Sequence, residues 1–192
     1  MGPKRSKKRD KIVEAFLQSV VESGLASSSM AEVASRVGID RSSLYHYFKS
    51  REELIDALTE FVVEHYIASF NSKLSTIVNG PERAHQLVEH LFGGFHQPKL
   101  SRVFDELCTA GHQEKHIAVQ VKMIYMAIET AILKEIDLGF PDASPEKRQM
   151  IGYALCQLAE GSSVMASLGF NVSRMMAGKE AALHLLRVLE SE

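Results

Sequence analysis

The chain has 192 residues, of which 45% are hydrophobic, and this suits one sizeable core with a small module attached. Its formal net charge of −2 conceals an asymmetry: residues 1–51 carry ten Lys or Arg against five Asp or Glu, whereas residues 52–192 carry twelve against nineteen. The basic end favours a polyanionic partner, and the acidic remainder would repel such a partner unless it were held away from it.

Residues 1–8 are predicted to form a basic flexible tail, rich in lysine and arginine from Lys4 onward. Such a tail can serve as an arm for the DNA minor groove, as a nuclear-import signal or simply as a solvated end. The first residues also fit a loose N-myristoylation pattern, but the proline after Gly2 makes a poor substrate. With no signal-like apolar start and no apolar run long enough to cross a bilayer, we expect a cytoplasmic protein without a membrane partner.

Residues 28–58 are expected to form a helix, a tight corner and a second helix. Apolar residues at spacings of three and four predict a short first helix with one buried stripe: Met30, Val33, Ala34 and Val37. Ser28 or Ser29 can cap its start. Gly38 suits the left-handed position that ends a helix, and Asp40 suits the cap of the next one.

In the second helix of this segment only Leu44 and Phe48 have to be buried. The other side chains form an outward set of hydrogen-bond donors, cations and aromatic rings: Arg41, Ser42, Ser43, Tyr45, His46, Tyr47 and Lys49. A small helical hairpin that never contacts DNA would also use glycine at its corner. The outward groups, however, are those that bind phosphate oxygens and base edges, which favours DNA binding.

These residues carry a family resemblance. Gly38-Ile39-Asp40, the run Ser43 to Phe48 and the run Lys49 to Leu54 resemble the helix-turn-helix signature of TetR-type transcriptional regulators. Apolar positions upstream resemble that family's first helix, so the specific resemblance covers residues 9–58. It implies a homodimer with one DNA-reading head per subunit and an all-helical effector domain, usually serving repression that a small molecule relieves.

The resemblance also implies roles for single residues. Ser29 matches a phosphate-contacting hydroxyl, and Lys49 and Arg51 match cationic positions at the start of the fourth helix; helix N-termini and cations both suit phosphate binding. We expect these residues and Tyr45 to position the DNA backbone. Base edges are expected to be read by Arg41, Ser42, Ser43 and His46. Tyr47 either joins this interface or stacks beneath the module.

Beyond the resembling segment the apolar pattern stays helical and shows no strand signal. A long fourth helix is expected before Asn79-Gly80-Pro81, and another long helix from Ile117 to Ile136. The predicted fold is all-α: an N-terminal three-helix helix-turn-helix domain over residues 9–51, followed by a helical ligand-binding and dimerisation domain over residues 52–192. Because the fourth helix runs from the head into the body, a change in the body could tilt the head.

Residues 146–168 are predicted to form a helix with two adjacent seams. A seam of large residues is expected to face the subunit's own core: Ile151, Leu155, Leu158, Ser162 and Met165. A seam of small residues would let another helix approach closely, and we interpret it as a subunit interface completed by the last helix. The predicted interface residues are Gly152, Cys156, Ala159, Ser163, Ala166, Leu183 and Leu186. A monomeric bundle would show the same pattern, but two recognition helices discriminate more base pairs than one.

The effector pocket is expected among flexible sulfur and aromatic side chains, although core packing would use the same residues. The candidates are Phe92, Phe95, Phe104, Met123, Tyr125 and Met126. The two cysteines, Cys108 and Cys156, are interpreted as buried thiols, with a redox-sensing pair as the alternative.

Two rival functions remain open. Cys108, His112 and His116 lie four residues apart, a spacing that can bind a transition metal in a small enzyme, although Gly111 interrupts the helix that would align them. The other rival is a protein-interaction module with a helix-turn-helix-like head. The chain has no phosphate-binding loop, nucleophile elbow or paired-carboxylate motif, so we expect neither catalysis nor a cofactor.

The favoured prediction is a DNA-binding transcriptional regulator. In this interpretation a homodimeric repressor binds a pseudo-palindromic double-stranded operator. An unknown small-molecule effector releases it through different affinities for two states of the protein.

Overall fold

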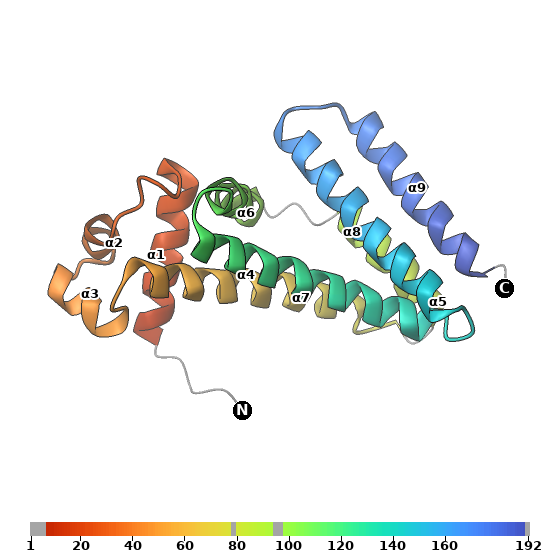
Figure 1. The fold of residues 1–192 in the computed structure, drawn as a ribbon, viewed down its shortest axis with the longest axis horizontal. Coiled ribbons are helices and arrows are strands. Elements are labelled where there is room, and N and C mark those ends of the chain that lie inside the picture. The colour runs from red at the N-terminus through yellow and green to blue at the C-terminus, as the bar shows by residue number, and fades with distance from the viewer. Residues whose placement is uncertain (1–6, 78–79, 94–97, 191–192) are drawn as a thin grey trace. The chain divides into compact units, whose positions relative to one another are not determined.

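The computed structural model describes residues 7–77, 80–93 and 98–190, and every regular element within these ranges is an α-helix. In chain order (Figure 1) the helices are α1 (Lys7–Ser23), α2 (Met30–Val37), α3 (Arg41–Tyr47), α4 (Arg51–Leu74), α5 (Gly80–Gly93), α6 (Pro98–Gly111), α7 (Lys115–Gly139), α8 (Pro145–Ser167) and α9 (Val172–Glu190). The expected all-α class is confirmed. Of the predicted basic tail, residues 1–6 lie outside the described residues, and Lys7 already belongs to α1.

The chain divides into two compact units. The first is Met1–Glu64 with Gln97–Ile124, and the second is His65–His96 with Tyr125–Glu192. Thus α6 and the start of α7 pack with the helix-turn-helix segment, and α4 and α7 each supply residues to both units. The domain boundary predicted after residue 51 separates a DNA-binding part from an effector-binding part, whereas the two units are defined by packing. That boundary stays a prediction.

In the first unit the buried side of each short helix is set by apolar residues at helical spacing. α1 buries Ile12, Phe16 and Val20, four residues apart, and packs against α2 and α6. α3 packs against α2, and its two anchors Leu44 and Phe48 are fully buried. Burial of each such side chain contributes about 1.5–3 kcal/mol, so these anchors fix α3 although it has only seven residues.

In the second unit α8 and α9 lie side by side, and α5 contacts both of them (Figure 1). The buried core combines residues from five helices, α4, α5, α7, α8 and α9, among them Phe70, Leu87, Val88, Ile132, Ile136, Leu155 and Leu186. Aliphatic side chains dominate this core, which is the expected composition for helices packed on several sides.

A buried ion pair ties three helices of the second unit together. The guanidinium of Arg83 in α5 donates two hydrogen bonds to the carboxylate of Glu135 in α7, with Nε–Oε2 and Nη2–Oε1 distances of 2.7 and 2.9 Å. The third nitrogen, Nη1, donates to the carbonyl oxygens of Leu74 and Ile77 at the end of α4. The Glu135 side chain is only 6% exposed and that of Arg83 20%, so the pair is shielded from water. Its bonds to Glu135 raise the pKa of Arg83 above the ordinary arginine value.

Among the described residues one helix, α7, is long and apolar enough to cross a membrane, judged by length and composition only. The expectation concerned a continuous apolar run, whereas α7 passes this test by its average hydropathy. Gln120, Lys122 and Glu129 interrupt the apolar residues, so no continuous run is visible, yet the average over the helix remains apolar. Core helices of globular proteins pass the same test, and Ile124 and Ile132 of α7 are fully buried within the protein.

Candidate nucleic-acid interface

Three residues fix the start of α2 and the corner between α2 and α3. Ser29 caps α2, where its hydroxyl accepts the N–H of Glu32 at 3.2 Å. Gly38 has φ of 73° and ψ of 37°, the left-handed conformation that glycine adopts at low cost, and Ile39 donates its N–H to the carbonyl of Ala34. Asp40 caps α3 by accepting the N–H of Ser43 at 2.8 Å. The predicted roles of Gly38 and Asp40 in this turn are confirmed.

Asp40 also accepts hydrogen bonds from two serine hydroxyls of α3, the helix expected to read the DNA. Ser42 Oγ donates to one carboxylate oxygen, and Ser43 Oγ donates to the other at 2.8 Å. The hydroxyl of Ser42 first, then the N–H and hydroxyl of Ser43, lower the pKa of Asp40 far below its ordinary value, so the cap is ionised at neutral pH. Because Asp40 takes both hydroxyl hydrogens, each serine offers a base edge an acceptor oxygen in this state.

The rest of α3 presents polar and aromatic groups to solvent. Leu44 and Phe48 are buried, whereas the exposed side chains are Arg41, Ser42, Tyr45, His46 and Lys49, the last just beyond the helix. Ser43 and Tyr47 are half-buried. Every side chain in the outward set predicted from the sequence therefore reaches the surface, and these residues share one short element.

Two cationic side chains lie over aromatic rings around this helix. Arg41 Nη2 donates to the hydroxyl oxygen of Tyr45 at 3.2 Å, and its Cζ lies 5.6 Å from the centre of the Tyr45 ring. From α1, Arg9 Cζ lies 4.6 Å from the centre of the Phe48 ring, on the buried side of the module. Such contacts contribute about 0.5–1 kcal/mol at exposed sites and restrict the rotamers of both partners. Tyr45 is thus held by Arg41 while its own hydroxyl hydrogen remains able to donate.

The corner between α1 and α2 is held by three side chains from outside it, which we call the corner clamp: Arg51, Arg102 and Glu106. Arg51 of α4 donates to the carbonyl of Leu25 at 2.7 Å. From α6, Arg102 Nε donates to the carbonyl of Val21 at 2.8 Å, and Glu106 accepts the N–H of Leu25 at 2.8 Å. The clamp therefore satisfies backbone groups that the end of α1 leaves without helical partners.

Gly24 makes room for this clamp. Its φ is 81°, and a Cβ at this position would lie 3.1 Å from a carboxylate oxygen of Glu106. The sequence pattern did not predict the roles of Arg102 and Glu106 in the clamp, because each lies 81 positions from its partner in the chain. Arg51, predicted as a DNA contact, uses one nitrogen inside the protein, and its contact with phosphate stays a prediction.

We expect Glu106→Ala to weaken binding to a specific operator about fivefold, because the free Leu25 N–H no longer fixes the α1–α2 corner and one hydrogen bond is worth ~1 kcal/mol. Glu106→Gln keeps an acceptor oxygen and should retain most of the affinity. Fluorescence anisotropy with labelled duplex measures both variants. The dependence of affinity on salt should stay as in the unmodified protein, since no phosphate contact is removed. An operator affinity unchanged in Glu106→Ala would show that the clamp does not position the head.

The possible metal cluster is not assembled. α6 ends at Gly111 and α7 begins at Lys115, so Cys108 and His116 lie on different helices, and His116 Nε2 lies 2.8 Å from Asp56 Oδ1 of α4. Within the part of the chain that the structure describes, no group of three His, Cys, Asp or Glu side chains is arranged to hold a metal ion. The metal-dependent enzyme therefore lacks its proposed site there.

The side chains predicted for the effector pocket lie in different surroundings. Phe92 is buried in the second unit and Phe104 in the first. Met123 and Met126 are 52% and 55% exposed on α7. Phe95 lies outside the described residues. Their joint role in a pocket stays a prediction.

Three of the predicted interface residues, Gly152, Cys156 and Leu186, are buried in the protomer's own core. Gly152 faces α7, where a Cβ would lie 2.5 Å from Leu133 Cδ2, so at this position the small side chain makes room for α7. The subunit interface along the rest of the seam stays a prediction. Burial raises the pKa of the Cys156 thiol to about 11. The other predicted interface residues are half-buried: Ala159, Ser163, Ala166 and Leu183. Tyr125 of α7, which was predicted to line the pocket, donates its hydroxyl to Glu160 of α8 at 2.9 Å.

A third seam of α8 is left in solvent. Its residues recur at steps of three and four: Met150, Tyr153, Gln157, Gly161, Val164 and Leu168. Leu168 is 71% exposed and Met150 62%, which is unusual for large apolar side chains that share one side of a helix.

Comparison with known proteins shows which family the helix-turn-helix segment matches. The sequence profile described as bacterial regulatory proteins, tetR family, matches residues 12–58, from α1 through the recognition helix into α4. The HTH-type transcriptional regulator BetI of Pectobacterium carotovorum is 25% identical over 77 residues, which is 40% of this chain and 40% of BetI. The nucleoid occlusion factor SlmA of Alteromonas mediterranea is 24% identical over 131 residues, 67% of this chain and 66% of SlmA. The helix-turn-helix segment, residues 12–58, is therefore of the TetR type.

The TetR fold extends along nearly the whole chain. The crystal structure of a TetR transcription regulator from Haloarcula marismortui superimposes with a TM-score of 0.79, covering 96% of this chain and 98% of that one, at 15% identity. The alignments with the relatives named above span less than two thirds of those proteins' lengths.

Proposed function

We propose that this protein is a TetR-family transcriptional regulator, namely a cytoplasmic, homodimeric repressor that binds a pseudo-palindromic operator and leaves it when a small molecule binds. The exposed side of α3 carries the proposal. Its polar and aromatic side chains are fixed from beneath by two buried anchors, Leu44 and Phe48, and by the corner at Gly38. Exposed hydrogen-bonding groups on so rigid a support suit the floor of a major groove.

The contacts divide into two kinds. Phosphate oxygens are expected to receive hydrogen bonds and charge from Ser29, Tyr45 and Lys49, with support from Arg51, and these contacts set the register of the protein on the duplex. Base edges are expected to meet Arg41, Ser42, Ser43 and His46. Tyr47, half-buried on α3, is expected to support the helix more than to contact a base.

The exposed seam of α8 supports the homodimer. Exposed apolar side chains that share one side of a helix, as Met150, Tyr153, Val164 and Leu168 do, are a common feature of protein interfaces. A second copy related by two-fold symmetry would cover the seam from Met150 to Leu168 with the same seam of its own, together with exposed small residues of α9 such as Ala177 and Ala181. Two heads held in this way would read two half-sites of an operator.

Release by an effector requires that the ligand favour one head arrangement over another. α4 offers a covalent path for such a change, because it starts beside the recognition helix at Arg51 and carries Phe70 and Leu74 into the core of the second unit. A ligand that shifts the second half of α4 would thereby also shift its first turn.

DNA affinity measured across a salt series tests the proposal. If each head neutralises about five phosphates, the logarithm of the affinity of the dimer should fall with the logarithm of salt concentration with a slope of roughly −9. Anisotropy with a labelled duplex between 50 and 200 mM salt, about the range used for such slopes, gives this number. A slope near half that value would contradict a dimer on the duplex, and an affinity that ignores salt would contradict DNA binding by α3.

A further inference from the structure

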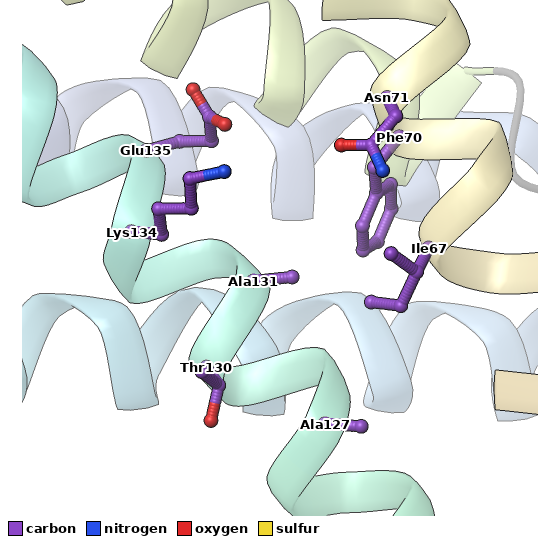
Figure 2. A pocket seen from close by; sticks show the side chains of 8 residues that line it. All are labelled: Ile67, Phe70, Asn71, Ala127, Thr130, Ala131, Lys134 and Glu135. Carbon is purple, nitrogen blue, oxygen red and sulfur yellow. The ribbon is translucent and has the colours of Figure 1, made fainter. Parts of the chain in front are cut away.

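α4 and α7 form a hollow of about 220 Å³ within the second unit. Its lining, seen in Figure 2, consists of Ile67, Phe70, Asn71, Ala127, Thr130, Ala131, Lys134 and Glu135. Of the side chains predicted for the effector pocket, those that the structure describes lie outside this lining: Phe92, Phe104, Met123, Tyr125 and Met126.

The floor of the hollow is apolar. Phe70 and Ile67 of α4 meet Ala127 and Ala131 of α7, and the two alanines leave the space that larger side chains would fill. An apolar cavity of about 150 Å³ admits benzene, and drug-sized molecules occupy about 300 Å³ or more. The present hollow therefore fits one small ring, or a short branched chain, with one polar group attached.

The polar rim of the hollow keeps one positive charge, because its other polar side chains bond to groups of the protein. The Glu135 carboxylate is engaged by both hydrogen bonds from Arg83, and the Thr130 hydroxyl donates to the carbonyl of Met126 at 2.7 Å. Lys134 is exposed and forms no ion pair within the part of the chain that the structure describes. One positive charge therefore remains at the rim.

An amide group, which can present either its oxygen or its N–H, lies opposite this charge. Lys134 extends from α7 toward α4, and the amide of Asn71 extends from α4 toward α7 (Figure 2). An ammonium and an amide N–H on facing helices can together hold the two oxygens of one carboxylate, since each oxygen accepts its own hydrogen bond.

We propose that this hollow binds a small amphipathic carboxylate. Its ring or branched chain lies on Phe70, Ala127 and Ala131, and its carboxylate lies between Lys134 and Asn71. The further step that this molecule is the effector rests on the proposed function, because α4 also carries the first turn beside the recognition helix. Occupancy of the hollow does not depend on that step.

Benzoate is a suitable probe, with benzyl alcohol and benzylamine as neutral and cationic molecules of the same size. Titration of the full-length protein by calorimetry should show saturable binding of benzoate, binding of benzyl alcohol that is about tenfold weaker, and no binding of benzylamine. Lys134→Met should weaken benzoate about tenfold and remove its advantage over benzyl alcohol. Equal binding of the three probes, or none for benzoate, would overturn the proposal.

Two further variants locate the site. Ala131→Leu fills the floor and should abolish benzoate binding, whereas Lys122→Ala, which removes an exposed lysine of α7 outside the lining, should leave it unchanged. Thermal melting confirms that each variant is folded, and if Ala131→Leu is not, Ala127→Val fills the same space with one less methylene. Benzoate binding unaffected by both Lys134→Met and a filled floor would place the ligand elsewhere and refute the site.

DNA affinity measured in the same preparations separates this proposal from the proposed function. Loss of operator affinity on adding benzoate, present in the unmodified protein and absent in Lys134→Met, supports the effector role. A protein that binds DNA but no benzoate refutes the hollow alone. A protein that binds benzoate but no DNA refutes the proposed function alone.

Discussion

Replacing Tyr45 and Lys49 together by alanine is expected to lower the affinity for duplex DNA about 100-fold, or ~3 kcal/mol. Lys49 supplies a cation beside the end of α3, and Tyr45 supplies a hydroxyl donor that Arg41 holds in place. Each subunit of a dimer loses both groups, so two phosphate contacts disappear per head and the salt dependence should become shallower. Anisotropy at fixed salt measures the affinity, and the salt series measures the slope.

Two controls accompany this variant. Lys122→Ala removes an exposed lysine of α7 and should leave DNA affinity unchanged, which separates a specific contact from a general change in net charge. Tyr45→Phe keeps the ring beside Arg41 but removes the hydroxyl, and should account for part of the loss. If the double variant is folded, judged by circular dichroism, and binds DNA as the unmodified protein does, α3 is not the reading element.

Arg83→Met is expected to lower the free energy of unfolding by about 3–5 kcal/mol, because it leaves the shielded carboxylate of Glu135 without its partner. The carbonyls of Leu74 and Ile77 lose their hydrogen bonds from Arg83 in the same step, so the end of α4 should fray as well. Urea unfolding followed by circular dichroism measures this free energy. The melting temperature should also fall by several degrees.

The double variant Arg83→Met with Glu135→Leu is the matched control. It removes both charges at similar volume, and a buried pair replaced in this way costs little or even stabilises. Most of the lost stability should therefore return. A single variant as stable as the unmodified protein would mean that water reaches Glu135 and that the pair is not structural.

The helix-turn-helix could be predicted because its determinants are local. Gly38, Asp40, Leu44 and Phe48 lie within eleven positions, and each acts on backbone or core next to it in the chain. Turn chemistry and helical spacing report such neighbours directly. The long helix α7 was visible for the same reason, since its apolar residues recur over many turns.

The parts that escaped prediction depend on which helices meet. At Gly152 the small seam of α8 faces Leu133 of α7, and spacing alone does not say which helix lies against each small residue. The subunit interface along the rest of this seam stays a prediction. The corner clamp joins residues 81 positions apart. The hollow is created by Ala127 and Ala131, whose small size carries meaning only once Phe70 is opposite them.

The two cysteines differ enough for one of them to serve as a native labelling site. Neither is in a disulfide; Cys156 is buried, with its pKa raised to about 11, whereas Cys108 is half-exposed on α6, two positions after the clamp residue Glu106. Because only thiolates react rapidly, a maleimide dye at neutral pH should attach to Cys108 and spare Cys156. The emission of that dye would then follow movements of α6 in the native sequence, as operator or ligand is added, without any engineered labelling position.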